Sequence, residues 1–155
     1  AVVVASQASE PTVIRLAFQL GASYYLIKPL NFDSLPDLFH SLCLEPRERA
    51  AADFAREHGV YLVLKGPGTI VAAPDGRCMR NPTGNCGMAK GGSGDVLTGL
   101  LTGLLAQGME PFDACCAAVW IHGRAGDMAA EEKGRRGMTP ADMIEKLPYA
   151  LKEVE

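Results

Sequence analysis

Residues 81–105 read NPTGNCGMAKGGSGDVLTGLLTGLL, a glycine-dense loop that runs directly into an apolar helix. Glycine lets the backbone adopt positive φ and come close to a ligand. From Val96 onward, valine and leucine recur at helical spacing, which predicts a helix with one apolar face. The unpaired N–H groups of a first helical turn, with the positive end of the helix dipole, suit a phosphate. The pattern therefore predicts an anion site where the loop meets the helix.

Two side chains near this junction are candidate helix caps. Ser93 and Asp95 both belong to residue types whose side chains accept hydrogen bonds from a helix's first N–H groups. Asp95 has a second interpretation, because a carboxylate beside a phosphate site is repelled by its ligand and so indicates a chemical role. The loop matches neither the Walker phosphate loop nor the G-x-G-x-x-G fingerprint. A plain glycine turn before a core helix stays the alternative.

Several motifs in a fixed order carry a family resemblance. They are KGPGT at 65–69, NPTGN at 81–85, GMAKGGSGDVLTG at 87–99, HGRAGDMAAEEKG at 122–134 and LPYALKEVE at 147–155. Residues from about 45 to 155 resemble the ADP/ATP-dependent NAD(P)H-hydrate dehydratases in these motifs. The resemblance implies a ribokinase-like fold and a lyase that uses nucleotide hydrolysis to remove water from hydrated NADH or NADPH.

The resemblance also implies roles for the residues around the glycine loop. Asp95 would be the base, or the group that orients the substrate hydroxyl, in phosphoryl transfer. Gly92, Ser93 and Gly94 would present backbone N–H groups to the transferring phosphate. Gly94 would also contact the nucleotide. Lys90 has two interpretations, a charge near phosphate or a surface lysine.

A second loop is assigned to the nucleotide on the same grounds. Its residues are Lys65, Gly66, Pro67, Gly68 and Thr69. The alternative is a plain turn with a solvated lysine. Asn81 is a further candidate nucleotide contact, or it shapes the loop that follows it.

The resemblance implies ADP or ATP as cofactor, and Mg²⁺ is expected with it because the phosphates need charge neutralisation. No side chains of the chain are assigned as metal ligands. His122 is expected to be a helix-packing histidine.

Composition limits the remaining classes. The 155 residues are 48% hydrophobic and carry a net charge of −3, which fits one globular domain and gives no basic surface for nucleic acid. The five cysteines are odd in number and form no C-x-x-C pair, which predicts reduced thiols and a cytoplasmic setting. No apolar run is long enough to predict a membrane span.

The order of elements predicts an α/β fold. Strands are predicted at 2–5, 24–27 and 60–64, a hairpin at 69–73 and 77–80, and helices at 11–20, 33–42, 45–58, from 96, from 111 and from 139. Alternating strands and helices favour a three-layer structure, a largely parallel sheet flanked by helices.

Residues 2–42 carry a second resemblance, to the last two strand–helix units of a response-regulator receiver domain of the sporulation type, a flavodoxin-like fragment. Ser6, Tyr25 and Lys28 fall at the receiver's switch positions and at its lysine before a proline. The strands that carry a receiver's phosphoacceptor have no counterpart, so phosphorelay signalling is not expected. The chain opens on a predicted strand, which is interpreted as a cut.

The two resemblances together predict a chimera of two pieces, 1–44 and 45–155, that share one sheet. The first hypothesis for function is nucleotide-dependent dehydration of hydrated NADH or NADPH, with the hydrate and an adenine nucleotide as partners and neither nucleic acid nor a membrane. The alternative is an α/β scaffold that binds phosphate or nucleotide weakly and has no catalysis. Whether copies of the chain associate as a homo-oligomer to complete a pocket stays open.

Overall fold

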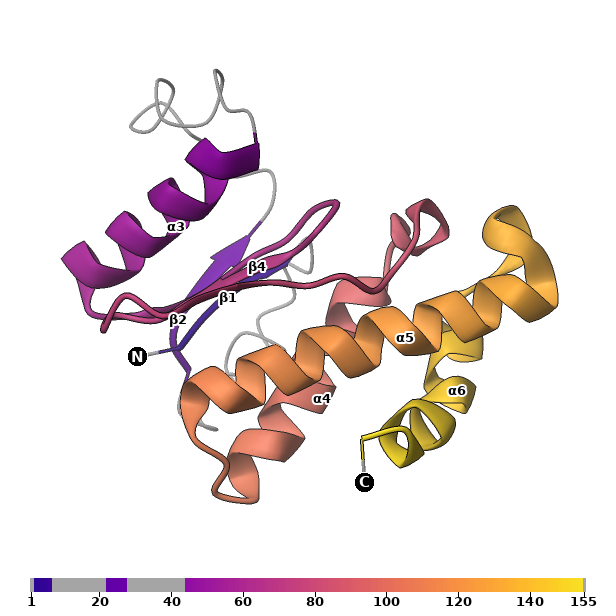
Figure 1. Ribbon diagram of the computed structural model, residues 1–155. Helices are drawn as coiled ribbons and strands as arrows, with labels where there is room; N and C mark the ends of the chain where they lie inside the picture. The colour runs from indigo at the N-terminus through magenta and orange to yellow at the C-terminus, as the bar shows by residue number, and fades with distance from the viewer. Residues whose placement is uncertain (1, 7–21, 28–43, 155) are drawn as a thin grey trace.

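The computed structural model describes residues 2–6, 22–27 and 44–154 (Figure 1). The predicted helices at 11–20 and 33–42, and Lys28, lie outside these ranges. The described elements are β1 (Val2–Ser6), β2 (Ala22–Ile27), α3 (Leu44–His58), β3 (Tyr61–Leu64), β4 (Ile70–Ala72), β5 (Cys78–Arg80), the short 3₁₀ turn η1 (Cys86–Met88), α4 (Ser93–Ala106), α5 (Pro111–Gly137) and α6 (Pro140–Lys152).

The described strands form one mixed sheet in the order β2-β1-β3-β4-β5. β1 pairs in parallel with β2 and with β3, where Val2 lies opposite Tyr61, so strands of both predicted pieces share the sheet. β3, β4 and β5 pair antiparallel. The hairpin predicted at 69–73 and 77–80 is confirmed by the β4–β5 pair. The expectation of a largely parallel sheet is nevertheless wrong for half of these pairings, because the tight loop at 65–69 also reverses the chain between β3 and β4.

Successive side chains of β3 and β4 point to opposite faces of the sheet, and both faces are covered. Leu62 lies opposite Ala72 and packs toward α3 with Ala51 and Ala55, all in one buried cluster. Val63 lies opposite Val71 and points to the other face. Successive strand residues point to opposite sides, so a continuous apolar run is what a strand covered on both faces requires. The three-layer prediction is confirmed, with α3 on one face and α4 and α5 on the other (Figure 1).

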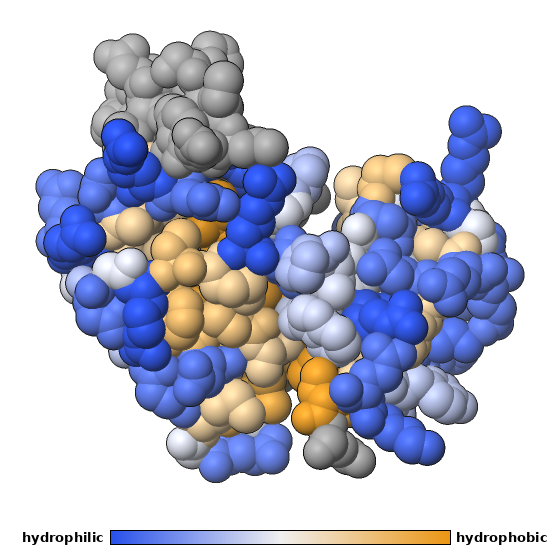
Figure 2. Space-filling view, viewed as in Figure 1, coloured by the Kyte–Doolittle hydropathy of each residue, from blue (hydrophilic) through white to orange (hydrophobic). Residues whose placement is uncertain are grey.

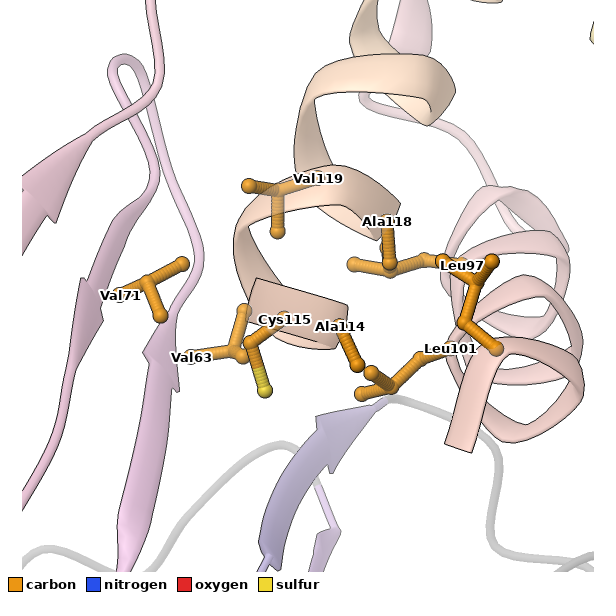
Figure 3. Close-up of a cluster of buried hydrophobic side chains, with 9 residues drawn as sticks. Val63, Val71, Leu97, Leu101, Ala114, Cys115, Ala118 and Val119 are labelled. Atoms are coloured by element: carbon orange, nitrogen blue, oxygen red, sulfur yellow. The ribbon is translucent and has the colours of Figure 1, made fainter. Parts of the chain in front are cut away.

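The largest core cluster lies between the sheet and the second helical layer. Figure 3 shows the two valines of β3 and β4 directed toward α5, and the leucines of α4 meeting α5 from its other side. The cluster comprises Val63, Val71, Leu97, Leu101, Leu104, Ala114, Cys115, Ala118 and Val119. Alanines on α5 let this helix lie close to both neighbours. Cys115 is fully buried here and serves as a small packing residue.

The helices begin and end within a few residues of the positions that the sequence predicts. α3 ends before Gly59, and Thr139 caps α6 by accepting a hydrogen bond from the N–H of Asp142. Gly134, with φ 72 and ψ 152, breaks the regular geometry near the end of α5. The helix end at 58 and the helix start at 139 were both predicted, and glycine at 134 is the residue type that ends helices.

The surface has no uniform character. On the face in Figure 2, hydrophilic side chains dominate over α3 and the C-terminal helices, and apolar side chains gather between α3 and the first half of α5. Among the helices that the structure describes, none combines the length and the apolar content that crossing a membrane requires.

Close approach of the 81–88 loop to α5 depends on a helical glycine. A Cβ placed on Gly123 would lie 2.8 Å from the carbonyl carbon of Thr83, which is backbone and cannot rotate away. We expect Gly123→Ala to lower the free energy of unfolding by about 1–3 kcal/mol, as overpacking does.

Gly103 on α4 is the matched control, since a Cβ there meets nothing within 4 Å. Gly103→Ala should raise stability by roughly 0.5–1 kcal/mol through helix propensity. Urea unfolding of the two variants checks the pair. Equal effects would show that the loop does not press on α5.

Candidate functional site

The candidate site lies at the edge of the sheet where the parallel strands β1, β2 and β3 end. Loops that leave the carboxyl ends of parallel strands meet at one edge and form ligand sites there. Lys65 follows β3 directly, and the first turn of α4 reaches the same region through contacts with α5. The two glycine motifs of the sequence thus come together at the middle of α5.

The first turn of α4 is left without a side-chain cap. The helix begins at Ser93, three residues before the predicted start, and its N-cap is Gly92 in the left-handed region at φ 89. The prediction that Ser93 or Asp95 caps the helix is wrong. The N–H groups of Gly92 and Gly94 have no acceptor among the described residues, and that of Ser93 reaches the Lys90 carbonyl only at 3.4 Å. These are the donors that an anion would use.

Asp95 stands in the first turn of α4 with its side chain exposed. Within the described part of the chain, its carboxylate forms no hydrogen bond or ion pair with another side chain or with the backbone. A structural aspartate at a helix start would cap the backbone. The carboxylate is thus available to a ligand.

His122 joins α5 to the first turn of α4. Its Nε2 donates to the Ser93 carbonyl oxygen at 2.7 Å and lies 3.5 Å from the Ser93 hydroxyl. Burial lowers the pKa of His122 from 6.5 to about 4; the hydrogen bond to Ser93 opposes this shift, and the positive charge of Lys65 adds to it. The ring is therefore neutral at pH 7. The expected packing role is confirmed, and the electrostatic effect of Lys65 shows that the 65–69 loop comes near the same histidine.

The loop 65–69 forms a tight turn fixed from both sides. The Thr69 hydroxyl donates to the Gly66 carbonyl at 3.2 Å, and the Asn81 N–H donates to the Thr69 carbonyl at 2.8 Å. These bonds order the backbone that the sequence assigns to the nucleotide. Lys65 is half-buried at its start.

Two arginines that the sequence did not single out flank this loop. Arg47 Nη1 donates to the Pro67 carbonyl at 3.3 Å. The guanidinium of Arg80 packs against Gly68, where a Cβ would lie 3.2 Å from its Cζ. Neither forms an ion pair with a described carboxylate. No local pattern points to them, because they lie 20 and 12 positions from the residues they contact (67 − 47; 80 − 68).

Asn81 is buried and its side chain is fully used inside the protein. Its Nδ2 donates to the carbonyls of Thr83 at 3.1 Å and Val119 at 3.0 Å. Its Oδ1 accepts from the Thr83 hydroxyl at 3.0 Å. Of the two interpretations, the contacts favour the loop-shaping one over a nucleotide contact.

The remainder of the glycine loop is tied to α5 as well. Asn85 Nδ2 donates to Asp127 Oδ1 at 2.9 Å and to the Gly126 carbonyl at 3.0 Å. The Lys90 ammonium donates to the carbonyls of Arg136 and Met138, so it braces the end of α5. This geometry favours a bracing role for Lys90 over a phosphate contact.

Positive charge without a metal centre characterises the site. Lys65, Arg47 and Arg80 surround the loop, and α4 directs its positive dipole end to the same edge. Across the residues that the structure describes, no three His, Cys, Asp or Glu side chains gather in a metal-binding group. Mg²⁺ bound through nucleotide phosphates needs no such group, because it keeps several waters and uses one or two carboxylates.

An α/β core in three layers, with an uncapped helix start beside a basic glycine loop, is the arrangement that proteins with phosphate-type anion sites use. A family model described as NAD(P)H-hydrate dehydratase matches residues 29–149. The chain therefore belongs to the NAD(P)H-hydrate dehydratase family. The match begins 16 residues before the predicted boundary at 45 (45 − 29), so it includes part of the stretch that resembles a receiver.

Relatives agree with this assignment. The bifunctional NAD(P)H-hydrate repair enzyme Nnr of Moorella thermoacetica is 49% identical over 111 residues, which is 72% of this chain and 21% of that protein. The ADP-dependent (S)-NAD(P)H-hydrate dehydratase of Bacillus subtilis is 37% identical over 109 residues, 70% of this chain and 40% of the relative. The chain thus spans about a fifth of the first protein and two fifths of the second.

Solved structures support the fold. The ADP/ATP-dependent NAD(P)H-hydrate dehydratase of Bacillus subtilis, co-crystallised with ATP/Mg²⁺, has a TM-score of 0.68 at 36% identity over 72% of this chain and 40% of its own. A ribokinase-like superfamily protein of Enterococcus faecalis has a TM-score of 0.56 at 33% identity, over 72% of this chain and 37% of its own. The ribokinase-like part of the fold prediction is confirmed.

Proposed function

We propose that this chain supplies the nucleotide-binding and catalytic part of an ADP- or ATP-dependent dehydratase of hydrated NADH or NADPH. The observation that carries the proposal is Asp95, an exposed carboxylate without a described partner in the first turn of an uncapped helix. Family membership and the names of the relatives give the reaction.

The roles of the chain's own groups follow from their positions. The backbone N–H groups of Gly92, Ser93 and Gly94 would stabilise negative charge on the phosphate as it transfers. Asp95 would accept the proton of the substrate hydroxyl as the oxygen–phosphorus bond forms. Loss of phosphate and a proton then leaves the reduced nicotinamide.

The loop 65–69 would hold the nucleotide. Thr69 and Gly66 fix the turn, and the positive charge of Lys65, Arg47 and Arg80 favours the polyphosphate. Mg²⁺ would neutralise phosphate charge when nucleotide is bound. Asn81 would hold the loop in place and would not itself contact the nucleotide.

The origin, setting and association of the chain are proposed on separate grounds. Residues 1–44 would be a flavodoxin-like, receiver-type piece joined to the dehydratase part; the pairing of β1 with β3 supports the sharing of one sheet by the two pieces. A cytoplasmic setting is supported by cysteines without a disulfide among those described. Association of two copies would be one way to complete a hydrate pocket.

Calorimetric titration with ADP and with ATP, magnesium present, tests the nucleotide site. We expect saturable binding by the chain, and at least tenfold weaker binding by Gly94→Leu, because a bulky side chain blocks approach of phosphate to the backbone donors. Gly103→Leu, in the last turns of α4 where a Cβ meets open space, is the control and should bind normally. A folded protein that gives no heat up to millimolar nucleotide would favour a scaffold without nucleotide function.

A further inference from the structure

We infer that His122 is a positioning residue that fixes the first turn of α4, and with it the backbone donors at Gly92 and Gly94, in the geometry that receives phosphate. The inference deepens the proposed function and rests on its phosphate site. It assigns to His122 a purpose beyond the packing that its position on α5 suggests.

The contact is specific to one carbonyl at one helix end. His122 Nε2 lies 2.7 Å from the Ser93 oxygen, a short bond whose direction requires a proton on Nε2. Ser93 is the first residue of α4 and stands between the two glycines whose N–H groups have no described acceptor. Glycine on both sides leaves this backbone with little intrinsic preference beyond the turn closed by the Asp95 and Val96 N–H groups on the Gly92 carbonyl, so a bond from α5 restricts it further.

Burial makes the anchor rigid. His122 and Ser93 are 7% and 5% exposed, so neither can exchange the bond for one to bulk water. The Ser93 hydroxyl reaches Met143 Sδ at 3.7 Å, and a Cβ on Gly92 would come within 3.1 Å of Pro140 Cγ. The turn is thus held by α5 on one side and by α6 on the other, with His122 providing the strong hydrogen bond.

Two substitutions separate hydrogen bonding from packing. Gln places an amide nitrogen near the position of Nε2, whereas Leu fills similar space without a donor. We expect His122→Leu to weaken ADP binding about tenfold, the loss that follows when a buried carbonyl loses its donor and the turn shifts. Binding of adenosine, which has no phosphate, should be unchanged. His122→Gln should restore most of the ADP affinity.

A control variant separates the effect of lost stability from the effect of the lost hydrogen bond. Leu104→Ala truncates a buried side chain in the last turns of α4, far along the helix from Ser93, and should destabilise the protein without changing the ADP-to-adenosine ratio. If His122→Leu weakens ADP and adenosine equally, or if Gln fails to rescue while folding normally, His122 only packs and the inference is overturned.

Hydrogen exchange in the nucleotide-free protein gives a reading that does not depend on the proposed function. Amides of residues 92–96 should exchange faster in His122→Leu than in wild type or in Leu104→Ala. If these amides exchange faster in His122→Leu but the wild-type protein does not bind ADP, His122 anchors the turn and the proposed phosphate site is wrong. Unchanged exchange would overturn the anchoring itself.

Discussion

Asp95→Asn should lower turnover of hydrated NADPH by about 10²–10⁴-fold, the contribution of a positioned general base. ADP affinity should be equal to wild type or higher, because the substitution removes a negative charge from the neighbourhood of the phosphates. Stability should fall by no more than about 0.3–1 kcal/mol, the effect of an acidic side chain on the helix dipole. Recovery of reduced-nicotinamide absorbance, calorimetry and urea unfolding give the three readings.

Asp113→Asn is the control at the same helical position. Asp113 is also exposed and lies in the first turn of α5, away from the middle of that helix where the site lies. It should lose a similar amount of stability and keep full turnover and binding. Wild-type turnover in Asp95→Asn would show that Asp95 is not the base. Unchanged stability and weaker ADP binding would instead make it a ligand contact.

Stability should fall as the solution becomes mildly acidic, because of His122. Its pKa is about 4 in the folded protein, lowered by burial from 6.5. Between these values the unfolded chain binds a proton that the folded chain does not, so the free energy of unfolding decreases as pH decreases. The full effect is roughly 3 kcal/mol, and about 2 kcal/mol should be lost between pH 7 and pH 5.

The His122→Gln variant isolates this contribution. Urea unfolding at pH 7 and pH 5 should show little change for the variant, which has no imidazole at this position. Asp142, whose pKa is lowered to about 2 by Lys133 and Thr139, loses its stabilising interactions only below about pH 4, so the two windows are separate. An equal decrease in wild type and variant would place the titrating group elsewhere.

Local signals in the sequence were sufficient for most of the elements. Gly59, Gly134 and Thr139 stop or start helices as their residue types predict, and the apolar run of β3 is covered on both faces. The β4–β5 hairpin was predictable from its Pro-Asp-Gly turn, but the antiparallel pairing of β3 with β4 was not, because the glycine loop at 65–69 did not show from its sequence that the chain reverses there.

The part of the site that depends on local sequence was predictable, and the part that depends on contacts between distant segments was not. The glycine motifs located the loop and the start of α4, because a glycine-rich motif consists of residues that are adjacent in the sequence. The cap was misassigned, because Gly92 takes a left-handed conformation that no side-chain pattern reveals. Arg47, Arg80 and the bond from His122 to Ser93 depend on tertiary contacts between distant segments. Such contacts leave no periodic trace in a single sequence.

One helix, α5, holds the glycine loop along much of its length. Carbonyls of α5 at Val119 and Trp120 accept from Asn81 and Thr83, and further along the helix the loop is held again near Asp127. Because α5 also bonds to the Ser93 carbonyl, any displacement of this helix would move the glycine loop and the first turn of α4 together.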